Sequence, residues 1–136
     1  MAVVVLVVWL LTAGLGGYLG TVWIRNGGLR QRGAGVTRLP VWLILGHVAL
    51  AVTGLTAWVV FVFGHVQASA WTACAVILVV ASFGFMMLFR WLPSSGLHAH
   101  AETTAERHFP FRAVVAHGAC AVATVVLVLV AAVHLT

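Results

Sequence analysis

Residues 113–135, AVVAHGACAVATVVLVLVAAVHL, decide the fold, because this stretch contains no Asp, Glu, Lys or Arg. A helix that crosses the hydrocarbon core of a bilayer needs about 20 apolar residues, at about 1.5 Å of rise per residue. Three further stretches are long and apolar enough: 2–24, 41–63 and 70–91. The sequence therefore predicts an all-α fold, an integral membrane four-helix bundle that forms a single transmembrane domain over residues 1–136. The two long loops of this bundle are 25–40 and 92–112.

The composition favours a membrane protein over a soluble one. Of the 136 residues, 63% are hydrophobic and 7% are charged, and the acidic side chains are Glu102 and Glu106 alone. A soluble domain of this size could not cover its surface with so few charges. The first apolar stretch is as hydrophobic as a secretory signal, but Met1-Ala2 supplies no basic region before it. We therefore expect it to be retained as the first membrane helix.

The arginines give the expected orientation in the membrane. The chain has no lysine, and its seven arginines lie in or beside the two long loops: Arg25, Arg30, Arg32, Arg38, Arg90, Arg107 and Arg112. Four spans place these loops on one side, which the positive-inside rule makes cytoplasmic. We expect both termini outside, contact with the lipid bilayer, and no nucleic-acid binding, because these arginines flank spans and do not line a groove.

Four tryptophans are expected to anchor helix ends at the membrane interface. They are Trp23, Trp42, Trp71 and Trp91. Trp9 and Trp58 lie deeper in their stretches and are expected to pack between helices.

An internal repeat places two histidines at one depth. His47 follows Pro40 by seven residues, and His117 follows Pro110 by the same seven residues. In both cases three residues separate the histidine from an Ala-Val pair. Proline is tolerated in the first turn of a helix, so an equal offset from proline means a nearly equal depth. The chain is thus predicted to contain two helical hairpins related by an approximate two-fold axis along the membrane normal.

A weaker similarity joins the first and third membrane stretches. It pairs Gly17-Tyr18 with Gly84-Phe85, and it leaves Arg25 and Arg90 at unequal distances after these pairs. The predicted duplication therefore depends mainly on the two stretches that contain the histidines.

Two imidazoles within hydrocarbon indicate a bound group. Burying an imidazole without a partner costs a few kcal/mol, and ionisable side chains within spans are functional hypotheses by default. The alternative is that each histidine only hydrogen-bonds a carbonyl or hydroxyl group of a neighbouring helix. Because His47 and His117 share one depth on parallel helices, we favour a shared metal, with haem b as the cofactor and both histidines as ligands of its iron.

Neighbouring residues fit a flat macrocycle between the two helices. Gly46 and Gly118 are direct neighbours of the two histidines and keep both helices slim. Close packing of helices explains such glycines equally well. Arg38 and Arg112 flank the inner ends of the same helices, where they are candidates to pair with haem carboxylates. The positive-inside distribution alone also accounts for these two arginines.

In its four spans and in His47 and His117, the chain resembles the four-helix transmembrane b-type cytochromes. That class holds haem b between paired histidines and passes electrons between quinone and a redox partner, so the resemblance implies haem b and quinone here. The chain is also similar to small four-span membrane proteins of high-GC bacteria with a Glu-Arg-His-Phe-Pro run, here residues 106–110, before a His-Gly pair. This second resemblance implies a multi-pass protein of the bacterial inner (plasma) membrane and no particular activity.

Two histidines at the outer helix ends suggest a second haem. His65 lies eighteen residues after His47, and His134 lies seventeen residues after His117. Their separations are wider than those of ligands in two-haem cytochromes. Interfacial capping or an outer metal site is therefore the alternative.

The second long loop is a further candidate for metal binding. It contains three histidines and both acidic residues: His98, His100, His108, Glu102 and Glu106. Such a set can bind zinc, copper or iron. A solvated loop, or a short interfacial helix that leads into the fourth span, is the alternative.

These observations lead to one principal hypothesis and two alternatives. The principal one is a membrane b-type cytochrome that passes electrons between quinone and a redox partner. The first alternative is a non-catalytic accessory or scaffold subunit of a larger respiratory or redox membrane complex, or a homodimer. The second is transition-metal handling by the histidine-rich loop. The chain has no nucleotide motif and no hydrolytic triad, and whether it is an enzyme stays open.

Overall fold

The computed structural model describes residues 1–31, 38–92 and 104–135, and every element in them is helical. Four helices are long and apolar enough to cross a membrane. They are α1 (Ala2–Arg25), α3 (Val41–Gly64), α4 (Gln67–Trp91) and α5 (Phe111–Leu135). Two short elements complete the fold, α2 (Gly28–Gln31) and the 3-10 helix η2 (Ala105–His108). The predicted all-α membrane bundle is confirmed.

The helix ends follow local backbone chemistry. α3 and α5 each begin at the residue after a proline, whose ring favours the first turn of a helix and cannot donate a hydrogen bond within it. α3 ends at Gly64, and the next residue, the C-cap His65, adopts a left-handed conformation with φ of 55°. This turn lets α4 begin at Gln67, three residues before the predicted span.

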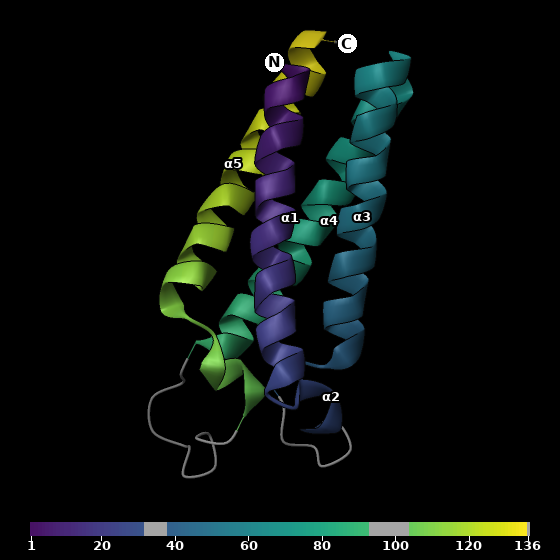
Figure 1. The fold of residues 1–136 in the computed structure, drawn as a ribbon. Coiled ribbons are helices and arrows are strands. Elements are labelled where there is room, and N and C mark those ends of the chain that lie inside the picture. Colours follow the sequence, from purple (N-terminus) through teal and green to yellow (C-terminus); the bar gives the residue numbers. More distant parts are fainter. Residues whose placement is uncertain (32–37, 93–103, 136) are drawn as a thin grey trace.

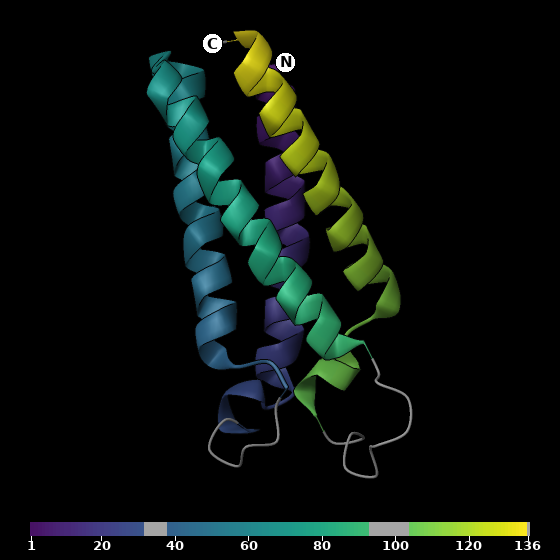
Figure 2. The same cartoon turned by 180° about the vertical axis from the view of Figure 1, so that it is seen from behind.

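The four long helices form a ring in the order α1, α3, α4 and α5 (Figures 1 and 2). α3 packs most extensively on α4, and α1 packs on α5, whereas the contacts that join these two pairs are fewer. α3 and α5 therefore lie across the bundle from each other. Both chain termini lie at one end, and α2 lies at the other. This arrangement agrees with the predicted threading, and the assignment of that second end to the cytoplasm stays a prediction.

The burial pattern supports the predicted duplication. Every residue from 44 to 58 is as buried, half-buried or exposed as the residue 70 positions later, the offset that relates His47 to His117. The pairing of α1 with α4 has an offset of 68 residues, which matches buried Val5 to Ala73 and Trp9 to Ile77. The two repeated hairpins are therefore α1 with α3 and α4 with α5. The register predicted from Gly17-Tyr18 is wrong by one residue, because this offset pairs Gly84 with Gly16.

The hydrophobic core occupies the half of the bundle nearer the termini. Its largest members are Trp9, Trp58 and Phe61. Trp58 is fully buried, and its indole N–H donates to the carbonyl of Ala2. A Cβ at Gly54 would lie 3.1 Å from the Trp9 ring, closer than ordinary contact, so glycine favours this close approach. Packing of Trp9 and Trp58 is as predicted.

The opposite end is closed by η2. Glu106 is 2% exposed, and its Oε1 accepts a hydrogen bond from the Arg38 backbone N–H at 2.7 Å. The indole N–H of Trp91 donates to the carbonyl of Glu106 at 3.0 Å. The Arg90 guanidinium donates to the carbonyl of Arg38. These bonds tie the start of α3 and the end of α4 to η2.

The predicted interfacial tryptophans fall into two groups. Trp42 and Trp71 are more than half exposed, as interfacial anchors should be. Trp23 is 3% exposed and therefore packs within the bundle, and its expected position at the membrane interface stays a prediction. After α1 the chain turns at Gly27, which has a φ of 87°, and Gly28 then lies directly against the Trp23 ring. A glycine is required at both positions, by conformation at the first and by contact at the second.

Candidate functional site

His47 of α3 and His117 of α5 face each other across the bundle. Their ring centroids are 6.4 Å apart, and the ring planes are inclined by 67°. Both residues are half-buried. The structure thus brings together the two histidines that the proline offset predicted to share one depth. They come from α3 and α5, which lie across the bundle from each other.

Each imidazole is oriented by a carbonyl of a neighbouring helix. The His47 Nδ1 lies 3.0 Å from the carbonyl oxygen of Val80, and the His117 Nδ1 lies 3.0 Å from that of Thr12. A carbonyl only accepts hydrogen bonds, so the proton of each neutral ring is on Nδ1. The lone pair is then on Nε2, for which no hydrogen bond is found among the described residues. This tautomer is the one that binds a metal through Nε2 while Nδ1 donates to a second group.

A glycine one helical turn beyond each carbonyl also contacts the imidazole. A Cβ at Gly16 would lie 2.9 Å from His117 Cε1, and a Cβ at Gly84 would lie 3.5 Å from His47 Cε1. Gly16 follows Thr12 by four residues, and Gly84 follows Val80 by four residues. The sequence interpretation missed these carbonyls. An alignment of Gly16 with Gly84 would have related the two residues that contact the imidazoles. The alignment made from the sequence paired Gly17 with Gly84 instead.

The separation of the rings fits one metal ion held between them. A nitrogen-to-metal bond is about 2 Å long and a ring centre lies about 1 Å behind its nitrogen, so two rings that share an ion have centroids roughly 6 Å apart. The observed 6.4 Å agrees with this value. No group of three or more His, Cys, Asp or Glu side chains that could hold a metal is found in the described ranges. A macrocycle that fills four positions in a plane needs only two axial ligands from the protein, so this donor set fits haem.

The small neighbours of the histidines differ in their surroundings. A Cβ at Gly46 would lie 2.9 Å from the Phe83 ring, so close packing of α3 on α4 explains this glycine. Gly118 is exposed and has open space beside it. Packing against a neighbouring helix therefore explains Gly46 but not Gly118.

The two arginines proposed for haem carboxylates lie at the predicted ends. Arg38 is half-buried beside η2, and Arg112 is exposed in the first turn of α5. Their pairing with a carboxylate stays a prediction.

The other described histidines lie at helix ends or in η2. His65 and His134 are exposed at the far ends of α3 and α5, and a second haem between them stays a prediction. His108 is exposed in η2. His98, His100 and Glu102 lie outside the described residues.

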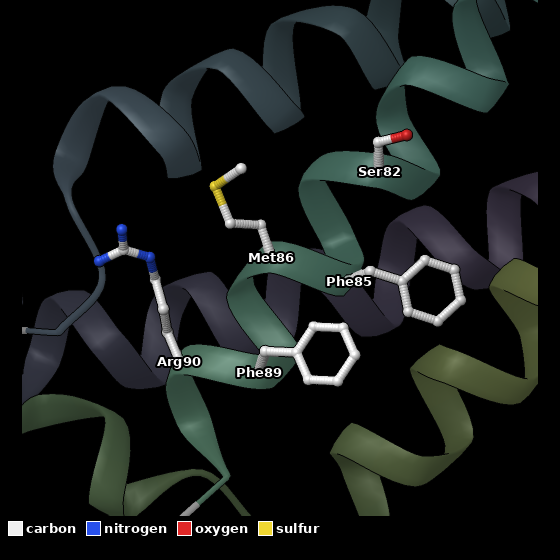
Figure 3. A pocket seen from close by; sticks show the side chains of 5 residues that line it. All are labelled: Ser82, Phe85, Met86, Phe89 and Arg90. Carbon is white, nitrogen blue, oxygen red and sulfur yellow. The ribbon is translucent and has the colours of Figure 1, made fainter.

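A shallow hollow lies on the outer face of α4, beside the same two turns that orient His47 (Figure 3). Five side chains line it: Ser82, Phe85, Met86, Phe89 and Arg90. Phe85 and Phe89 point to one side of α4, and Met86 and Arg90 point to the other. These lining residues span positions 82–90 of α4, a range that includes Gly84, which contacts His47, and that begins two residues after Val80. The hollow is thus separated from the histidine pair by the thickness of α4, about 10 Å, and by an axial offset along the helix.

A scan of protein-family models and searches of curated proteins and of solved structures found no match to this chain.

Proposed function

We propose that this chain is a membrane b-type cytochrome in which His47 and His117 bind the iron of one haem b. The observation that supports it is the facing pair of imidazoles, 6.4 Å apart, each with Nδ1 bound to a carbonyl. When bound, the haem supplies a one-electron couple between ferric and ferrous iron. The protein supplies two neutral ligands, their orientation and an apolar surrounding.

The carbonyls of Val80 and Thr12 act on the ligand atoms through the rings. A hydrogen bond from Nδ1–H to a carbonyl makes Nε2 a stronger donor and fixes the ring plane. A stronger donor favours the ferric state and so lowers the reduction potential. The carbonyls belong to helix backbones, so both rings are held by rigid elements.

Thr12 connects the site to the core. Its hydroxyl lies 2.9 Å from that of Thr124, and both residues are buried between α1 and α5. Each hydroxyl also lies within hydrogen-bond distance of a carbonyl four residues earlier in its own helix, Val8 or Cys120. This pair of hydroxyls joins α1 to α5 at the residue whose backbone carbonyl orients His117.

Quinone is the proposed electron partner, and the hollow on α4 is its proposed site. Quinones dissolve in the bilayer, and the hollow opens on the lipid-facing side of α4. Phe85 and Phe89 offer rings for stacking on an aromatic head group, and Arg90 offers donors to a quinone oxygen. The separation from the histidine pair, which is the thickness of α4 and an axial offset, is short enough for direct electron transfer.

One spectrum tests the haem. The purified, haem-supplemented protein should give a reduced-minus-oxidised spectrum of b-type, and His47→Gln and His117→Gln should each abolish it. His65→Gln is the matched control, because His65 is on the same helix as His47 but exposed at its far end. A haem-loaded wild-type sample without this band, or His47→Gln and His117→Gln variants that keep it, would overturn the proposal.

A second experiment tests the quinone. Phe89→Ala should slow haem reduction by a short-chain quinol severalfold and leave the spectrum unchanged. Phe63→Ala is the control, because Phe63 at the end of α3 is equally exposed, 73% against 72% for Phe89. Equal reduction rates in both variants would remove the hollow as the quinone site.

A scaffold function is the second candidate, because the same hydrogen bonds also hold neighbouring helices together. His47 links α3 to α4, and His117 links α5 to α1. The amide nitrogen of glutamine lies one bond farther from the backbone than the Nδ1 of histidine, and it still offers a donor to the carbonyl. The scaffold hypothesis predicts that the glutamine variants assemble almost normally and that the wild type carries no haem.

A further inference from the structure

The indole of Trp23 is a buried donor with no acceptor in the described ranges. The residue is 3% exposed, and its Nε1 is fully buried without a hydrogen-bond partner there. A buried donor without an acceptor destabilises the folded protein, because it has lost its hydrogen bond to water. Its counterpart in the repeat, 68 residues later, is Trp91, whose Nε1 donates to the carbonyl of Glu106. The two-fold relation thus leaves one indole satisfied by the chain and the other not.

Trp23 lies on the same face of α1 as the glycine that seats His117. It follows Gly16 by seven residues, which is within about 20° of two full turns at about 100° per residue. The axial distance is about 10 Å at 1.5 Å of rise per residue, toward the end of the bundle that carries η2. Gly28 contacts the indole and holds its plane in place. The donor is therefore fixed at the η2 end of the face that carries the histidine site.

We propose that the Trp23 indole N–H binds a carboxylate of the haem held by His47 and His117. This inference rests on the proposed function and adds a residue to that site. Indole only donates, so it needs an acceptor, and haem b carries two carboxylates on one edge. Its reach from iron to carboxylate is similar to the axial distance between Gly16 and Trp23. The nearby Arg38 and Arg90 supply donors to the same end of the bundle but cannot satisfy an indole.

The test removes the N–H and keeps the ring. Trp23 is replaced by benzothienylalanine, which has sulfur in place of the N–H, and also by phenylalanine in Trp23→Phe. Haem labelled with 13C in its carboxylates is bound, and the redox difference infrared spectrum and the rate of haem release to an apoprotein acceptor are recorded. We expect the labelled carboxylate signal to shift and haem release to accelerate about tenfold, the effect of one charge-assisted hydrogen bond.

The controls separate this bond from general damage. Trp91→Phe removes a comparable ring whose N–H already has a carbonyl acceptor, and should leave the labelled signal unchanged. Glu102→Gln removes a carboxylate of the chain and should also leave it unchanged. If both Trp23 replacements keep the wild-type signal and release rate while haem is bound normally, the inference is wrong and the proposed function stands. If the wild type binds no haem, the proposed function fails first.

Discussion

Gly16→Ala and Gly84→Ala form a matched pair, because the two-fold relation places them equivalently against the two histidines. A Cβ at Gly16 would lie 2.9 Å from His117 Cε1, so the ring has to move by about 0.5 Å to reach the 3.4 Å at which ordinary contact begins. A Cβ at Gly84 would already be in ordinary contact with His47 Cε1, at 3.5 Å. A ligand has to stay within about 0.5 Å of its productive position. We therefore expect damage from the first substitution and none from the second.

The expected magnitudes follow from two opposing terms. Overpacking costs about 1–3 kcal/mol, whereas replacing glycine by alanine within a helix favours the helix by about 1 kcal/mol. Gly84→Ala should therefore be neutral or more stable by up to about 1 kcal/mol. Gly16→Ala should weaken haem binding by about tenfold, since the moved ring also loses its bond to the Thr12 carbonyl.

Haem titration of the two variants in detergent, with thermal unfolding of each, measures both quantities. A Gly16→Ala variant that binds haem as tightly as Gly84→Ala would refute the reasoning, because the difference between 2.9 and 3.5 Å would then have no consequence.

Three further substitutions test the surroundings of the site. Thr12→Val removes the hydroxyl bond to Thr124 and should destabilise the protein by about 1 kcal/mol in thermal unfolding, with haem affinity unchanged because the carbonyl stays; a loss of haem would contradict this. Glu106→Ala leaves the N–H of the half-buried Arg38 without its acceptor and should destabilise the protein by about 1–3 kcal/mol. Glu106→Gln, whose amide oxygen still accepts, should restore most of that stability, and equal losses would count against the bond. Gly54→Ala places a Cβ 3.1 Å from the Trp9 ring and should lower the unfolding temperature, at a cost of about 1–3 kcal/mol, while a rise would show that this contact yields.

Much of the fold followed from hydrophobic length and proline position. The four apolar stretches predicted the four long helices, and Pro40 and Pro110 predicted that His47 and His117 share one depth. Their facing across the bundle also agrees with the two-fold relation. The helix positions and the depth of each histidine depend on residues along one helix, so they can be predicted directly from the sequence.

Other features depend on which helices pair in space. The carbonyls that orient the histidines come from α1 and α4. Every residue has a backbone carbonyl, so residue type does not show which carbonyl accepts a hydrogen bond from a histidine. The sequence did not show that Trp23 is buried, because this depends on Gly27 and Gly28, which allow α2 to turn back over its ring. The hollow beside Phe89 arises from the outer face of one helix, which the sequence shows only as apolar.

The central claim is that both imidazoles bind one iron, and electron paramagnetic resonance of the oxidised protein tests it most directly. Two nitrogen ligands make ferric haem low-spin, and ring planes inclined by 67° should make its signal highly anisotropic, because strongly inclined planes bring two iron d orbitals close in energy. We expect this signal in the wild type, and in His117→Gln we expect its loss or its replacement by a high-spin signal. A high-spin signal in the wild type, or a low-spin signal that survives in His117→Gln, would contradict the claim.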